Sequence, residues 1–600
     1  MNKFTIEKRS GTYSELLETY GFTNLLRKIY DSANISDAEI VIEDKEMYYE
    51  ITTNTPITDE MIGKLSFFPL FRYVKQKIDA DVSLYPDFFD YPTQREWKKE
   101  RQTLLNQAYK EYKGKEKESE RDRRIAEIKN IFETDKRIDI ALDIYVQIIT
   151  PNNFPGFDKL YQNIFNNKDL FSLFISEIIH TYGERGYVNK GFEKIVKNIT
   201  FSKNVTATQL YNPNQGQGVN KLKADGLNRK NFDSSWICES LKISGALTDM
   251  ICQPVKSGSS YDLKIFVPEY KQVKYHFKSN LIPDFKKYLK GNTPIQIDIL
   301  NILLLTQKVI ENQGFTGVRM KVKNIVSGLH SVYQKDLGQN KAVVNIGFIQ
   351  VPDFIEIGNK EENQAWIDII ENQRQIIRGI KELEGASQGL LYYRNFISGS
   401  DVSNFFKFSY WYAAYISTQL SNKKYVRLFS IESLNQFYKC MDTNELKLSE
   451  ITSSIGFQAI AYAIRKSTVT LLLTPKEARQ YEPRYGVAQA LQSKSKSSTD
   501  LAEYIGDFIS FYNSETAMKS DKEKPGKLTD ASSQEQKNMK SRRYVRENEL
   551  SDFYSLLDKY SPKSKLIGAM LASYGFALSA KENKSVENLS DDNTEENTDE

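Results

Sequence analysis

The sequence predicts an α+β N-terminal body, irregular and mainly helical with small antiparallel sheets, followed by an all-α C-terminal helical bundle. Strand-like and helix-like runs interleave over residues 1–382 without the regular alternation of a parallel βαβ sheet. Strand signals nearly stop after residue 362. Apolar residues then recur at helical spacing up to residue 578, and each apolar stripe covers about a third of a helix surface.

Within the body, helical and strand-like periodicities predict the elements in chain order. The first half gives a helix at 16–29, strands at 40–42 and 47–51, a long polar helix at 96–132, and helices at 138–149 and 170–182. The polar stretch 211–231 predicts a loop. Strands follow at 263–267 and 342–349, with a helix at 294–312 between them.

Apolar stripes predict the helices of the bundle at 405–416, 457–464, 501–512, 550–560 and 566–574. A short polar turn at 493–498 interrupts them, and the Lys- and Ser-rich stretch 519–543 is expected to be a mobile loop. The composition of 579–600 predicts a disordered acidic tail. The chain therefore divides into a body at 1–382, a helical bundle at 383–578 and the tail.

Composition excludes several functional classes. Of the 600 residues, 40 % are hydrophobic and 12 % aromatic, which is ample for a globular core. The most apolar stretch, 295–310, is interrupted by polar residues, so we expect no membrane span. The N-terminus has no apolar signal segment, and we expect a cytoplasmic protein. Three histidines and three cysteines lack the spacing of metal ligands, so we expect no metal, no cofactor and no histidine-based catalytic site.

Positive charge is concentrated in one segment of the chain. The net charge is +4, but residues 581–600 carry two lysines and eight acids, which leaves +10 for the rest. The basic loop at 185–230 holds nine basic and two acidic residues, a net charge of +7. Such asymmetry indicates a polyanionic partner, with nucleic acid as the leading interpretation. The alternative is a lysine-rich surface that only keeps the protein in solution.

The loop within this segment is the most unusual local sequence. Its glycines allow close backbone approach to a ligand, its Asn and Gln amides suit base edges, and its cations suit phosphates. An ordinary surface loop would also be rich in Gly and Asn. The candidate nucleic-acid-binding residues are Asn212, Asn214, Gln215, Gly216, Gln217, Gly218, Asn220, Lys221, Lys223, Asn228, Arg229 and Lys230.

A second set of cations lies in the predicted bundle. These residues have the composition of a groove that holds a single nucleic-acid strand through its phosphates. Ordinary solvated helix faces would look the same in sequence. The residues are Arg465, Lys466, Arg479, Arg484, Lys494 and Lys496.

One short pattern also resembles a nuclease site. Asp262 precedes a strand-like run that ends in Glu269 and Lys271. Two carboxylates can hold Mg²⁺ while a lysine orients water, which would make the protein a Mg²⁺-dependent nuclease. Otherwise Glu269 and Lys271 are surface residues at a strand end. A third interpretation is a structural interaction protein with no role on nucleic acid.

Several stretches, in this order along the chain, resemble the large subunit of type I CRISPR interference complexes, known as Cascade. They are YSELL at 13–17 with YG at 20–21, GQGVNK at 216–221 with KADG at 223–226, YRNFISG at 393–399, GFQAIA at 456–461 with AIR at 463–465, RYGVAQ at 484–489, and SYGFA at 573–577. The resemblance extends over nearly the whole chain, from about residue 10 to 578.

The resemblance implies a non-catalytic protein with an α+β body and a C-terminal bundle similar to the Cascade small subunit. Such a subunit recognises the protospacer-adjacent motif on duplex DNA and supports strand separation and R-loop formation, while the guide reads the sequence. Its implied partners are crRNA, target double-stranded DNA, the backbone and other Cascade subunits, and a helicase–nuclease or transposition proteins recruited downstream. In some related systems the bundle is also made from an internal start, for which Met441 is the candidate here.

Overall fold

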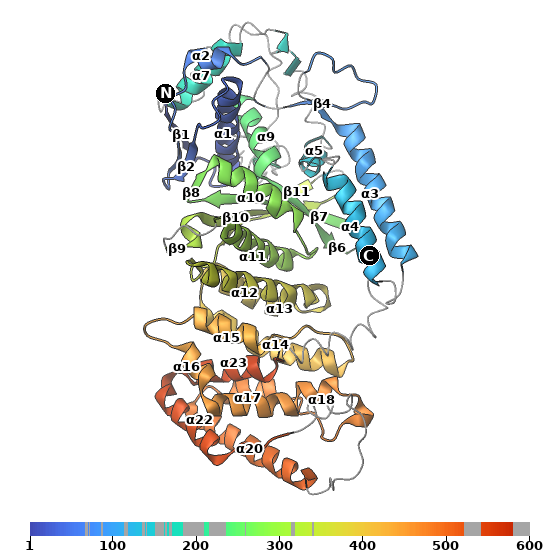
Figure 1. Cartoon of the computed structure of the whole chain (residues 1–600), viewed down its shortest axis with the longest axis vertical. Coiled ribbons are helices and arrows are strands. Elements are labelled where there is room, and N and C mark those ends of the chain that lie inside the picture. The colour runs from blue at the N-terminus through green and yellow to red at the C-terminus, as the bar shows by residue number, and fades with distance from the viewer. Residues whose placement is uncertain are drawn as a thin grey trace, which may run out of the picture. The chain divides into compact units, whose positions relative to one another are not determined.

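The computed structural model describes residues 1–66, 70, 72–85, 88–112, 118–134, 139, 141–149, 161–162, 165–166, 171–183, 209–214, 236–258, 260–313, 319–338, 341–520 and 542–579. The chain folds into two compact units (Figure 1). Unit 1 draws on 1–294, 304–313 and 320–351, and unit 2 on 295–303, 314–319 and 352–600. The predicted boundary at 382/383 falls inside unit 2.

The first sheet of unit 1 has four antiparallel strands in the order β1-β3-β2-β8. Their bounds are β1 Lys3–Glu7, β2 Ile40–Asp44, β3 Tyr48–Thr53 and β8 Gln272–Lys274. Phe4 and Ile42 both face Ile51 in the register, and all three side chains are buried. This alternation of apolar and polar residues confirms the strands predicted at 40–42 and 47–51.

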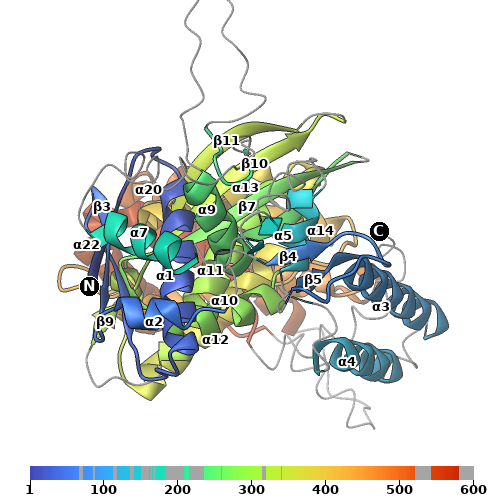
Figure 2. The ribbon, with the colours of Figure 1, turned by 90° about the horizontal axis from the view of Figure 1, so that it is seen from above.

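The second sheet is larger and also antiparallel, with the order β11-β10-β7-β6. Its strands are β6 Ile251–Ser257, β7 Ser260–Tyr270, β10 Val326–Asp336 and β11 Lys341–Gln350. Figure 2 shows β10 and β11 as a long hairpin. β7 lies between two neighbours and is buried over most of its length, and its apolar run Ile265–Val267 is flanked by the buried charged residues Lys264 and Glu269.

Helix α1 (Ser14–Ser32) and helix α9 (Trp236–Asp249) lie side by side in unit 1 (Figure 1, Figure 2). They cross at two glycines. A Cβ on Gly21 would lie 1.9 Å from the Leu241 carbonyl oxygen, and one on Gly245 would lie 2.0 Å from that of Leu17. Only glycine at both positions lets the two backbones approach so closely.

The remaining elements of unit 1 are short strands and helices around these sheets. They are α2 Asp59–Gly63, β4 Tyr73–Lys75, β5 Phe88–Asp90, α3 Tyr91–Glu111, α4 Glu118–Thr134, α5 Leu142–Ile149, α7 Phe171–Gly183, α10 Tyr275–Lys287 and β9 Met320–Lys321. Helix α11 (Pro294–Gln313) has residues in both units. The single long helix predicted at 96–132 is wrong, because α3 ends at Glu111 and α4 packs back against it. Ala108, Ile128 and Phe132 form the small core between them.

Unit 2 is helical apart from β12 (Glu356–Ile357) and an isolated bridge between Ser430 and Leu578, within the part of the chain that the structure describes. Its α-helices are α12 Lys360–Gly379, α13 Ser387–Gly399, α14 Val402–Ser421, α15 Ile431–Cys440, α16 Leu448–Ser453, α17 Ile455–Ser467, α18 Val469–Leu473, α19 Val487–Lys494, α20 Ser498–Ser520, α22 Glu547–Lys559 and α23 Ser564–Gly575. The predicted apolar stripes form its core.

Aromatic residues dominate this core. Phe405 of α14 lies 4.7 Å from Phe437 of α15 between ring centroids, and 5.1 Å from Phe396 of α13. Helix α14 also packs on α23, and α17 packs on both α22 and α23. These contacts confirm an α+β body followed by an all-α bundle.

The predicted turn at 493–498 is confirmed, since α19 ends at Lys494 and α20 begins at Ser498. Most of the predicted loop 519–543 and of the predicted acidic tail lies outside the described residues. A search of the described helices finds none with both the length and the apolar character to cross a membrane.

Candidate nucleic-acid interface

Residues 209–214 lie at the centre of the basic loop and are bound to the start of α1. The Tyr13 hydroxyl donates to the Leu210 carbonyl over 2.5 Å, and Ser14 Oγ donates to the Tyr211 carbonyl over 2.9 Å. Asn214 Nδ2 donates to the Ser10 carbonyl over 2.7 Å. The other candidate loop residues lie outside the described residues, namely Gln215, Gly216, Gln217, Gly218, Asn220, Lys221, Lys223, Asn228, Arg229 and Lys230.

Asn212 completes a buried polar network with helix α9. Its Nδ2 donates to Glu239 Oε2 over 2.8 Å, and its Oδ1 accepts from Lys242 Nζ over 2.8 Å. Lys242 Nζ also bonds Glu239 Oε1 at 3.0 Å. Burial alone would lower the pKa of Lys242, but the Glu239 carboxylate outweighs burial and raises that pKa above its ordinary value.

Both ends of the Asn212 amide are therefore used inside unit 1, and the side chain has no exposed surface. This differs from the base-reading role that the sequence suggested for Asn212. In the described structure Asn212 fastens the middle of the basic loop to α9, and Asn214 fastens it to Ser10, which lies just before α1. No local sequence pattern predicts these contacts, because the partners Glu239 and Ser10 are remote along the chain.

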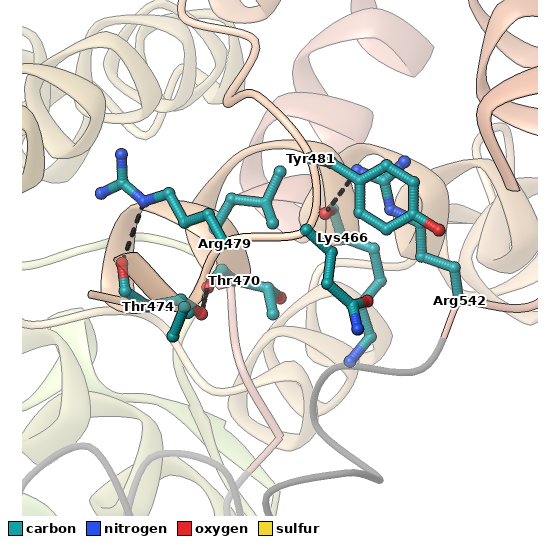
Figure 3. A pocket seen from close by; sticks show the side chains of 9 residues that line it. Lys466, Thr470, Thr474, Arg479, Tyr481 and Arg542 are labelled. Atoms are coloured by element: carbon teal, nitrogen blue, oxygen red, sulfur yellow. Dashed lines mark hydrogen bonds between the residues drawn. The ribbon is translucent and has the colours of Figure 1, made fainter. Parts of the chain in front are cut away.

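In unit 2, one pocket is lined by several cationic side chains and an aromatic ring. Lys466 at the end of α17 lines it together with Arg479, Tyr481 and Arg542. Figure 3 shows Arg479 on one side of the pocket and Arg542 on the other, with the Arg542 guanidinium behind the Tyr481 ring. That guanidinium lies 3.4 Å from the ring centroid. The contact is a stacked cation–π pair, which holds the charge in one orientation.

Hydrogen bonds fix both arginines of the pocket. Arg542 Nη2 donates to the Lys466 carbonyl over 3.3 Å, and Arg542 Nη1 lies 3.0 Å from Glu515 Oε2. Arg479 Nε donates to the Thr474 carbonyl over 2.9 Å (Figure 3). Arg479 has no carboxylate partner within the described ranges. Three cations, Lys466, Arg479 and Arg542, therefore line the pocket.

Arg484 extends the same surface through a shared carboxylate. Its Nη2 lies 3.3 Å from Glu515 Oε2, the oxygen that also meets Arg542. Its guanidinium lies 4.4 Å from the ring centroid of Phe511, which is 58 % exposed. Burial lowers the pKa of Arg484, and the nearby Glu515 opposes that effect. Cations and an exposed ring therefore share one face, a combination typical of strand-binding surfaces.

The other cations suggested by the sequence lie elsewhere. Arg465 is buried, and its Nη1 donates to the Tyr574 carbonyl over 3.3 Å, so it is part of the bundle interior. Lys494 and Lys496 are exposed at the turn between α19 and α20. Neither lysine is among the described residues that line the pocket. Sequence reasoning missed Arg542 and Tyr481, although Arg542 begins a run of two arginines and a tyrosine that interleaves charge with an aromatic ring.

The residues of the suggested nuclease site do not meet. Asp262 and Glu269 are seven positions apart on β7, which separates them by about 23 Å at about 3.3 Å per residue. Asp262 accepts from the Tyr333 hydroxyl and the Asp336 amide. Lys271 Nζ lies 4.0 Å from Asp44. Among the described residues, no group of three His, Cys, Asp or Glu side chains has the geometry of a metal site.

Glu269 instead belongs to a buried cluster between the two sheets. Its carboxylate accepts from Tyr49 over 2.7 Å and lies 3.1 Å from both Lys8 Nζ and His330 Nε2. Burial would raise the pKa of Glu269, but His330, Lys8 and Tyr49 together hold it at about 2, below the ordinary 4.5. These three neighbours hold the carboxylate in the interior of unit 1.

A scan against protein-family models finds no match to this chain, and a search of curated proteins finds no significant relative.

Proposed function

We propose that this protein is the non-catalytic large subunit of a type I CRISPR RNA-guided DNA surveillance complex. In that role it recognises the protospacer-adjacent motif on duplex DNA and supports strand separation and R-loop formation. The observation that carries the proposal is the basic and aromatic surface of unit 2, where Lys466, Arg479 and Arg542 line one pocket beside Tyr481. Cations interleaved with aromatic rings hold nucleic acid through phosphates and stacked bases.

The basic loop supplies the second part of the proposal. Residues 209–214 in its middle are bonded to α9 through Asn212 and to Ser10, just before α1, through Asn214. A rigid base under a polar loop is the usual arrangement for recognition. We assign motif reading to Asn214, Gln215, Gln217, Asn220 and Lys221, and phosphate contacts to Lys223, Arg229 and Lys230.

The order of the two units fits the same role. The α+β unit 1 comes before the helical region, as the resemblance to Cascade large subunits implies. The partners of the proposed subunit are crRNA, target double-stranded DNA and the other Cascade subunits. A helicase–nuclease or transposition proteins would be recruited downstream. The proposal places the protein in the cytoplasm.

The decisive test is co-purification of the tagged protein from its native operon, followed by sequencing of the bound RNA. We expect one uniform class of repeat-flanked guide RNA together with a backbone subunit. Recovery of a stable protein that is free of RNA and of other subunits would contradict the proposal.

Motif recognition is tested with target duplexes whose flanking positions are randomised. The combined variant Gln215→Ala, Asn220→Ala, Lys221→Ala is expected to lose motif preference. The control Lys64→Ala, which removes an exposed cation paired with Glu60 on α2, is expected to keep it. If the combined variant retains both preference and affinity, the loop assignment is wrong.

The two alternative functions, a nuclease and a structural interaction protein, predict different results with the purified protein. Mg²⁺-dependent cleavage by the isolated protein, abolished by Glu269→Ala in a folded variant, would favour a nuclease. Failure to bind any polyanion even at low salt would favour a structural interaction protein. Our proposal expects binding whose affinity falls steeply with salt, because phosphate neutralisation releases counterions.

A further inference from the structure

Arg542, which lines the pocket of unit 2, has one donor without an acceptor among the described residues. The Arg542 side chain is 2 % exposed, and its Nε has no hydrogen-bond partner among the described residues. Its two terminal nitrogens are already bonded, one to Glu515 and the other to the Lys466 carbonyl. A buried donor on a charged group without an acceptor is costly, and it is satisfied when an anion or water enters.

The position of this donor is fixed in advance. Stacking on Tyr481 at 3.4 Å and on Tyr512 at 5.1 Å holds the guanidinium plane. Glu515 and the Lys466 carbonyl hold its two terminal nitrogens. A ligand entering the pocket would therefore not need to order this side chain, which lowers the cost of binding.

The charge of the lining favours an anion. Lys466, Arg479 and Arg542 all line the pocket, no carboxylate is among the described residues that line it, and Glu515 is shared between Arg542 and Arg484. Arg479 is fixed by the Thr474 carbonyl through Nε, while no carboxylate in the described part of the chain neutralises it. Arginine forks match the oxygens of a phosphate in both spacing and charge.

We propose that the pocket lined by Lys466, Arg479, Tyr481 and Arg542 is a binding site for a single phosphate group. The phosphate belongs either to a free nucleotide or to the backbone of a single-stranded nucleic acid. The second source deepens the proposed function and rests on it. Three exposed aromatic rings offer stacking surfaces for bases. Phe511 contacts Arg484, Tyr485 follows Arg484 in the sequence, and Tyr544 lies two positions after Arg542.

Binding to the full chain is measured by isothermal titration with three probes: inorganic phosphate, adenosine monophosphate and a short oligothymidylate. Arg479→Ala is expected to weaken binding of the occupying probe by roughly tenfold, the effect of one charged hydrogen-bonded contact. Arg479 is partly exposed, so the variant is expected to fold. The control Lys407→Ala removes an exposed cation of α14 and is expected to bind like the parent chain.

Glu515→Gln provides a test of opposite sign. Removing the carboxylate that competes for Arg542 and Arg484 is expected to tighten phosphate binding several-fold. Binding of adenosine monophosphate would identify a free nucleotide as the source of the phosphate. Binding of the oligothymidylate and of neither other probe would identify a single-stranded nucleic acid as the source. Indistinguishable affinities of Arg479→Ala and Lys407→Ala for every probe would overturn the inference. If guide RNA co-purifies with the protein but Arg479→Ala binds every probe as tightly as the parent chain, the phosphate site is contradicted and the proposed function is not.

Discussion

Asn212 donates a hydrogen bond over 2.8 Å to Glu239, a carboxylate with no exposed surface. The same amide accepts from Lys242, so a neutral side chain joins both members of a buried ion pair. Through this network a loop residue becomes part of the interior of unit 1. The contribution of Asn212 is therefore to stability, and the neighbouring loop cations are separable from it.

Asn212→Ala is expected to destabilise unit 1 by about 1–3 kcal/mol, because Glu239 and Lys242 each lose a buried partner. Denaturant unfolding measures the change. Lys221→Ala is the matched loop variant, expected to keep stability and to weaken nucleic-acid binding. A stable Asn212→Ala protein that has lost only affinity would show that the amide acts on a ligand.

Glu269 is expected to make stability depend on acid pH. Its pKa is about 2 in the folded protein and ordinarily 4.5, so its stabilising effect is complete above about pH 4.5. That effect, of about 3 kcal/mol, is lost as the pH falls from about 4.5 to about 2. Glu269→Gln should therefore cost more stability near pH 6 than near pH 3. Equal costs at the two pH values would contradict the low pKa.

Gly21→Ala is expected to disrupt the α1–α9 crossing. The added Cβ would lie 1.9 Å from the Leu241 carbonyl oxygen, and a backbone atom cannot move aside cheaply. We expect a loss of about 1–3 kcal/mol or more in the free energy of unfolding. Gly347→Ala on β11 is the control, since nothing lies within 4 Å of its added Cβ. Similar thermal melting of both variants would show that α1 and α9 do not cross so closely.

Lys278→Met is expected to be among the most destabilising substitutions in unit 1. Lys278 Nζ bonds both carboxylate oxygens of Asp249, at 2.8 and 2.6 Å, and both residues are 1 % exposed. Removing the cation leaves an unpaired buried charge, which costs about 3–5 kcal/mol. Lys274→Met removes an exposed lysine paired with Glu39, where we expect less than about 1 kcal/mol. Chemical denaturation of the two variants separates these values.

Much of the fold could be predicted because the periodicity is strong. Strands β2, β3, β7 and β11 alternate or run apolar as expected, and the aromatic stripes of α14, α17 and α20 face the core of unit 2. The division of residues 96–132 into α3 and α4 could not be predicted, because polar helical spacing continues through both helices. Their reversal is set by a small core at Ala108, Ile128 and Phe132.

The candidate site was predicted only in part. Arg479 and Arg484 were identified from their basic neighbours and are partly exposed, whereas Lys466 and Arg465 are both buried, Arg465 against Tyr574. Whether a cation faces solvent depends on its helix face and on remote partners, and local composition reveals neither. The pairing of Tyr481 with Arg542 spans 61 positions, a separation at which sequence patterns carry no information about contact.

The packing of α14 and α15 bears on how the gene could be read. Tyr410 of α14 bonds Ser495 and the Lys565 carbonyl, and Tyr438 of α15 bonds Ser573. A polypeptide translated from Met441 would contain α23 but neither of those helices. In such a product, the apolar surface that α14 and α15 cover in the full chain would be exposed to water. The short product would then require a second polypeptide to cover that surface before it could accumulate in the cell.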